Sequence, residues 1–92
     1  MSVKVVLPSA LRGEVDGASH LTVDTSGTVG AVLGEISERW PRLAQRIQTQ
    51  RGELRRFVNV YVDGEDCRIM GAEDAKVPDG AEIMVLPSVA GG

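Results

Sequence analysis

The sequence predicts an α+β fold in which one mixed β-sheet packs on one main helix. Short β-branched segments with alternating character lie near both ends of the chain, and one central segment repeats apolar residues at helical spacing. One helix covering one face of a sheet is a stable two-layer arrangement. Because 92 residues suffice for one domain, we expect residues 1–92 to form a single domain that ends in a flexible tail at 87–92.

The first third of the chain predicts a pair of strands. Residues 3–7 (VKVVL) alternate and are rich in β-branched side chains, and Pro8 ends this strand. Residues 11–17 are polar and interrupted by glycines, which is typical of a loop. Residues 20–24 alternate again, so we expect them to pair antiparallel with the first strand.

The main helix begins at Thr28, a plausible N-cap. Its apolar residues are spaced to form a single stripe, which consists of Val29, Val32, Leu33, Ile36 and Trp40. We therefore expect Trp40 to be largely buried where the helix meets the sheet. Pro41 suits the first turn of a short helical continuation. A polar connection with three arginines follows at 48–56.

The clearest strand is predicted at residues 57–62 (FVNVYV). The Asp63-Gly64 pair after it is a strong hairpin signal. We expect residues 65–69 to form the short returning strand, with Cys67 within it.

The last third of the domain contains one more strand. We expect residues 70–77 to be irregular, a turn at 78–80 and a final strand at 83–86. This order of elements predicts a β-grasp, in which the last strand lies centrally beside the first and the tail leaves from one end of the sheet.

Alternation along the two best strands predicts which side chains face the helix. Those expected to face it are Val58, Val60, Val62, Ile83 and Val85. Those expected on the open face, as a partner docking surface, are Phe57, Tyr61, Met84 and Leu86. An apolar group on an otherwise solvated face is typical of a docking site. Single exposed apolar residues are also normal on protein surfaces, and that interpretation stays open.

Charge and composition exclude several classes of function. A net charge of −3 argues against nucleic-acid binding and against a polybasic membrane anchor. The sequence shows neither a signal peptide nor an apolar run near the roughly 20 residues of a membrane span. Cys67 has no second cysteine with which to form a disulfide. We therefore expect a protein of the reducing cytoplasm.

The domain lacks an evident enzyme site. His20 and Cys67 cannot alone build a structural zinc site, so no metal is expected, and Cys67 is expected to be a packing residue. Gly27, Gly30 and Gly34 do not have the spacing of a phosphate-binding loop. The carboxylates are scattered, without a partner that would suggest a triad. We expect no catalytic residue and no bound cofactor.

The C-terminal residues carry the functional hypothesis. They are Val89, Ala90, Gly91 and Gly92. Two glycines lack Cβ atoms, so a tail of this kind is slim enough to enter the active site of a partner protein. The reactive group would then be the carboxylate of Gly92. A frayed, glycine-rich end without function is the alternative.

Three segments resemble the ubiquitin-like sulfur carriers of the ThiS/MoaD family. Residues 86–92 (LPSVAGG) look like the C-terminus of that family, and residues 78–83 (PDGAEI) resemble its "DGDEV" turn. Residues 56–66 (RFVNVYVDGED) are most similar to the CysO branch, whose members read "RFVNIYVNDED".

The resemblance implies a stoichiometric carrier of sulfur and not an enzyme. A MoeB/ThiF-like enzyme would adenylate Gly92 with ATP, and sulfur would replace AMP to give a thiocarboxylate. In the CysO branch the acceptor is a PLP-dependent cysteine synthase, and a JAMM-type metallopeptidase releases cysteine. Molybdopterin, thiamine and thiolated secondary metabolites remain alternative products.

Two other hypotheses stay open. In the first, Gly92 is joined to protein lysines, as in a ubiquitin-like modifier. In the second, the chain is a β-grasp interaction domain in which the two glycines are incidental.

Overall fold

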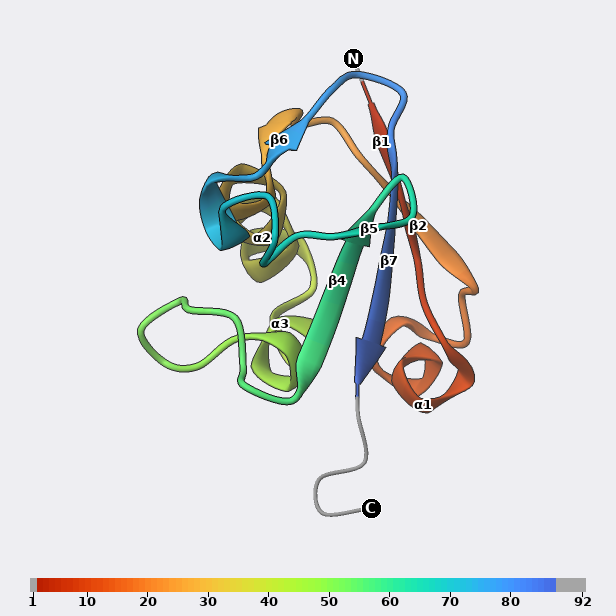
Figure 1. Cartoon of the computed structure of the whole chain (residues 1–92). Helices are drawn as coiled ribbons and strands as arrows, with labels where there is room; N and C mark the ends of the chain where they lie inside the picture. Colours follow the sequence, from red (N-terminus) through yellow and green to blue (C-terminus); the bar gives the residue numbers. More distant parts are fainter. Residues whose placement is uncertain (1, 88–92) are drawn as a thin grey trace.

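A five-stranded mixed sheet with the order β2-β1-β7-β4-β5 forms one layer of the molecule (Figure 1). Its strands are β1 (Val3–Val6), β2 (His20–Val23), β4 (Val58–Val62), β5 (Glu65–Asp66) and β7 (Glu82–Pro87). β7 pairs parallel with β1 and antiparallel with β4. This computed structural model describes residues 2–87. It confirms the predicted β-grasp, with the last strand central and β1 and β2 antiparallel.

Two consecutive helices form the second layer, and both begin as the sequence predicts. α2 (Val29–Arg39) starts at Thr28, whose hydroxyl accepts a hydrogen bond of 3.1 Å from the backbone N–H of Ala31. α3 (Pro41–Ile47) has Pro41 in its first turn, where a missing N–H costs nothing. The helical residues buried in the core are Val29, Val32, Leu33, Ile36, Leu43, Ala44 and Ile47.

The expected burial of Trp40 is wrong. Trp40 is only partly buried at the edge of the core, and the Arg39 guanidinium lies 4.3 Å from the centre of its ring. The cause is the backbone, because Trp40 ends α2 in a non-helical conformation (φ −135°, ψ 70°). Its side chain therefore leaves the stripe, which stops at Ile36. Leu43 and Ile47 of α3 supply the apolar surface that follows.

Five short elements were not expected from the sequence, and two of them lie at residues 9–15. The predicted loop at 11–17 is largely helical, with α1 (Ser9–Arg12) followed by the 3₁₀ turn η1 (Gly13–Val15). Leu11 and Val15 are buried there.

The segment at 70–77 is also more regular than expected. It contains the 3₁₀ turn η2 (Ala72–Asp74) and the strand β6 (Lys76–Val77). β6 pairs antiparallel with β3 (Gly27–Thr28) to form a separate two-stranded sheet beside the start of α2. Such elements are too short to show a periodic pattern in the sequence. They form because of contacts with distant segments of the chain.

The predicted hairpin is present, but its second strand is shorter than expected. Asp63 and Gly64 both have positive φ (49° and 88°), as a two-residue hairpin turn of type I′ requires. β5 covers two residues and not five. Cys67 therefore lies in the turn that follows β5, and not within a strand.

The core between the two layers is aliphatic. Its side chains are mainly valine, leucine and isoleucine, and among residues 2–87 no polar or charged residue is buried. The expected inward residues of β4 and β7 are all at most 5% exposed. Within the same residues, no helix is both long enough and apolar enough to cross a membrane.

Candidate functional site

The open face of the sheet carries the apolar side chains that alternation predicts. Tyr61 lies opposite Met84 in the β4–β7 register, and Leu86 lies opposite Asn59. Met84 and Leu86 are each 37% exposed, and Tyr61 is partly exposed. Phe57 precedes β4 and is 50% exposed. Tyr61, Met84 and Leu86 lie in β4 and β7 as expected, whereas Phe57 lies outside the strand, and the role of all four in docking stays a prediction.

β7 holds the root of the tail in a fixed place. It is hydrogen-bonded on both sides, to β1 and to β4, and its register with β4 extends to Val58 opposite Pro87. Figure 1 shows the end of β7 at the same end of the molecule as α3 and the start of β4. The predicted tail residues, Val89 to Gly92, lie outside the described residues 2–87.

Phe57 and Pro87 line a shallow hollow at this root, together with arginines from α3 and from the connection before β4. The arginines are Arg46, Arg55 and Arg56. Arg55 and Arg56 belong to the polar connection at 48–56, for which the sequence predicts no function, and Arg46 belongs to α3. The position of these three arginines beside the end of β7 depends on the packing of α3 against the sheet, which residue spacing alone does not show.

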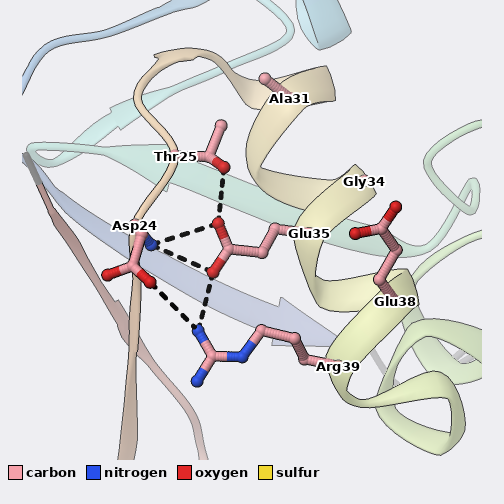
Figure 2. A pocket seen from close by; sticks show the side chains of 7 residues that line it. All are labelled: Asp24, Thr25, Ala31, Gly34, Glu35, Glu38 and Arg39. Atoms are coloured by element: carbon pink, nitrogen blue, oxygen red, sulfur yellow. Dashed lines mark hydrogen bonds and ion pairs between the residues drawn. The ribbon is translucent and has the colours of Figure 1, made fainter.

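A second hollow lies between α2 and the chain that follows β2, and Figure 2 shows the side chains that line it. At its centre the Glu35 carboxylate accepts hydrogen bonds from the Thr25 hydroxyl and from the backbone N–H of Asp24 (3.0 and 3.1 Å to its two oxygens). Arg39 donates to the same carboxylate at 2.8 Å.

These contacts determine the charge state of Glu35. The Thr25 hydroxyl, then the Asp24 N–H, and to a smaller extent Arg39 lower the pKa of Glu35 from 4.5 to about 2, against the opposing effect of burial. Glu35 is therefore ionised at neutral pH with its oxygens occupied. A carboxylate in this state is a poor proton donor. We assign it the structural task of joining β2 to α2.

Cys67 is a packing residue in its environment. It is fully buried, and burial, reinforced by the Asp66 carboxylate, raises the pKa of its thiol. The thiolate is the reactive form, so this position disfavours nucleophilic chemistry. His20 is exposed at the start of β2. No group of three or more metal-ligating side chains occurs within the described part of the chain.

Comparisons with known proteins agree with this arrangement. The model of the ThiS family matches residues 5–92. The sulfur carrier protein CysO of Mycobacterium tuberculosis is 37% identical over the full length of both chains. Its crystal structure superposes with a TM-score of 0.83, covering 95% of this chain and 99% of CysO.

Two further relatives are informative. A chain in the crystal structure of the Amycolatopsis orientalis BexX/CysO complex is 34% identical, with a TM-score of 0.86 over 98% of this chain and 99% of that one. Small archaeal modifier protein 3 of Haloferax volcanii is 34% identical over 76% of this chain and 75% of its own length. The full-length match and the shared fold together identify this chain as a member of the ThiS family of ubiquitin-like sulfur carrier proteins, in the CysO branch.

Proposed function

We propose that this chain carries sulfur as a thiocarboxylate on Gly92. The observation that carries the proposal is the family match, which extends through the diglycine to residue 92 in a chain similar to CysO over its whole length. The geometry is compatible with it. β7 ends at Pro87 at one end of the sheet, and it is paired there with β4.

The chemistry requires two steps, both performed by partner enzymes. A carboxylate oxygen of Gly92 attacks the α-phosphorus of ATP in a MoeB/ThiF-like enzyme, and pyrophosphate leaves. A sulfur nucleophile then attacks the activated carbonyl carbon, and AMP leaves with the C–O bonding electrons. Activation is needed because a free carboxylate is a poor electrophile. The carrier holds no cofactor in this scheme and is consumed stoichiometrically, so it is a co-substrate and not an enzyme.

The acceptor proposed for the thiocarboxylate is a PLP-dependent cysteine synthase. Similarity to CysO supports this choice. A JAMM-type metallopeptidase would then release cysteine from the carrier. Molybdopterin, thiamine and thiolated secondary metabolites are the alternative products, made by other sulfur-accepting synthases. We place the cycle in the cytoplasm, where ATP is available.

A second candidate function is protein modification. The similarity to small archaeal modifier protein 3 of Haloferax volcanii favours it. Adenylation of Gly92 would be the same, but the acceptor would be a lysine amine and the product an isopeptide. Isopeptide adducts of this chain in cell lysate would support this alternative.

Intact-mass analysis after incubation with ATP, a MoeB-like enzyme and a sulfide donor tests the proposal. The loaded chain should be heavier by the difference between one sulfur and one oxygen. A chain that lacks Gly92 is the control, and it should not load. Normal loading of that control would refute the sulfur-carrier mechanism and leave the interaction-domain hypothesis.

A further inference from the structure

The positive charge of this acidic protein is concentrated in one segment. Residues 40–56 contain five of the ten basic residues and one of the thirteen acidic residues, so their formal charge is +4 while the rest of the chain has −7. The five are Arg42, Arg46, Arg51, Arg55 and Arg56, and all are exposed.

Most of these charges lack an internal counterion. Within residues 2–87, Arg46 pairs with Glu14 at 2.9 Å, and the other four arginines have no carboxylate within 4.0 Å. Arg55 donates to the backbone carbonyl of Gln45 at 2.9 Å, and the Arg56 guanidinium lies 5.6 Å from the centre of the Phe57 ring. Positive charges that the fold leaves unneutralised are available for a negatively charged partner.

The segment is held in a defined shape. Gln48 and Leu54 form a β-bridge, and the side chain of Gln48 donates to the Gly52 carbonyl at 3.0 Å. The Arg68 guanidinium donates to the Arg55 carbonyl at 2.9 Å, which joins the segment to the turn after β5. A preorganised surface loses little conformational entropy on binding.

The segment at 40–56 lies beside the end of β7, from which the tail continues. Arg46, Arg55 and Arg56 line the same hollow as Phe57 and Pro87, the last described residue of β7. A partner that takes up the residues beyond Pro87 must therefore approach close to these arginines.

We propose that the unpaired Arg55 and Arg56, together with Arg46 and Phe57 of the same hollow, form the surface by which the adenylating enzyme recognises the carrier, and that this enzyme presents Asp and Glu side chains beside the entrance for the tail. The inference rests on the proposed function. We choose the adenylating enzyme as the partner because it binds the carrier before the tail is modified. A C-terminal diglycine alone would not distinguish this chain from other proteins with the same ending, so the enzyme must obtain its selectivity from the folded domain. The exposed Phe57 ring, with Arg56 beside it and Arg46 and Arg55 in the same hollow, fits a contact with an apolar centre and a charged rim.

The test compares two single charge reversals, Arg56→Glu and Lys76→Glu. Lys76 lies in β6, at the opposite end of the molecule from the end of β7 (Figure 1), and it is also exposed. Pyrophosphate release by a MoeB-like enzyme of the same organism is measured against carrier concentration. Arg56→Glu should raise the KM for the carrier about tenfold with kcat unchanged, because a charge at the rim of an interface acts mainly on association. Lys76→Glu should leave KM within about twofold of the wild type.

Salt provides a second readout of the same surface. The difference in KM between Arg56→Glu and the wild type should shrink as ionic strength rises, because the Debye length falls from about 10 Å at 0.1 M to about 3 Å at 1 M. Equal KM values for the two reversals would overturn the recognition surface while leaving the sulfur-carrier function intact. Absence of pyrophosphate release with the wild-type chain would overturn both. Loss of binding to a DNA duplex by Arg56→Glu, with KM unchanged, would assign the arginines to nucleic acid instead.

Discussion

The two faces of the strands β4 and β7 differ sharply although they share the same backbone. On the helix side, Val60 and Val85 are fully buried, whereas Met84 and Leu86, one residue away on β7, are each 37% exposed. The buried face therefore contributes most of the folding free energy of the domain, and the side chains of the open face are accessible to a partner. Substitutions on the buried face should reduce stability, and substitutions on the open face should reduce binding. Substitutions at the edge of the core should cause an intermediate loss of stability.

Val85→Asp should have the largest effect. It would place a carboxylate in an aliphatic core with no polar partner, at a cost of several kcal/mol. Total stability for such a domain is about 5–15 kcal/mol, so the loss would be most of it. We expect circular dichroism to show no cooperative thermal transition. A folded Val85→Asp protein beside an unfolded Leu86→Asp protein would mean that the two faces are exchanged.

A comparison of Ile36→Ala with Trp40→Ala tests whether Trp40 lies at the edge of the core. Ile36 is 1% exposed, so its truncation should cost about 2–5 kcal/mol. Trp40 is only partly buried, and its truncation should cost less, about 1–3 kcal/mol, although the side chain is larger. Urea unfolding of the two variants gives both values. A greater loss for Trp40→Ala would show that this ring belongs to the core after all.

The Glu35 contacts predict a pH-dependent contribution to stability. The pKa of Glu35 is lowered in the folded chain, so its contribution is fully present above its unfolded value of 4.5 and is lost as the pH falls toward about 2. Glu35→Gln should therefore be less stable than the wild type at neutral pH. The gap between the two unfolding free energies should narrow steadily as the pH is lowered through this window. A gap that is independent of pH would assign the effect to packing.

Leu86→Asp should have the smallest effect on folding. Leu86 points to the open face, where substitutions usually change stability by no more than about 0.5 kcal/mol. Its complex with the adenylating enzyme should nevertheless weaken, because a charge would be desolvated in an apolar contact. Isothermal titration with that enzyme measures the change. Unchanged affinity would remove Leu86 from the docking surface.

Elements with a repeating pattern were predictable from the sequence, and elements defined by distant contacts were not. The valines of β4 recur every second residue, as in a strand, and the stripe from Val29 to Ile36 recurs at helical spacing. The strand, the helix and their buried faces could therefore be predicted. β3 and β6 are two residues each, and they form because they pair with each other across the chain. Trp40 has the correct spacing for the stripe, but its own non-helical backbone removes it from that face.

The candidate site divides in the same way. Alternation along β7 was sufficient to place Met84 and Leu86 on the open face. The arginine surface was missed, since its residues approach Pro87 only after α3 packs against the sheet and the connection before β4 folds back. The Glu35 contacts were missed for the same reason, because they join β2 to α2.

Fragmentation of the sulfur-loaded chain in a mass spectrometer tests the central claim most directly. The mass increment is expected in the fragments that contain Gly92, and it should correspond to exchange of one oxygen for one sulfur. Fragments that contain Cys67 but lack the C-terminus should be unmodified, since that thiol is buried and its pKa is raised. An oxygen-for-sulfur increment that is missing from every fragment containing Gly92 would contradict the sulfur-carrier mechanism.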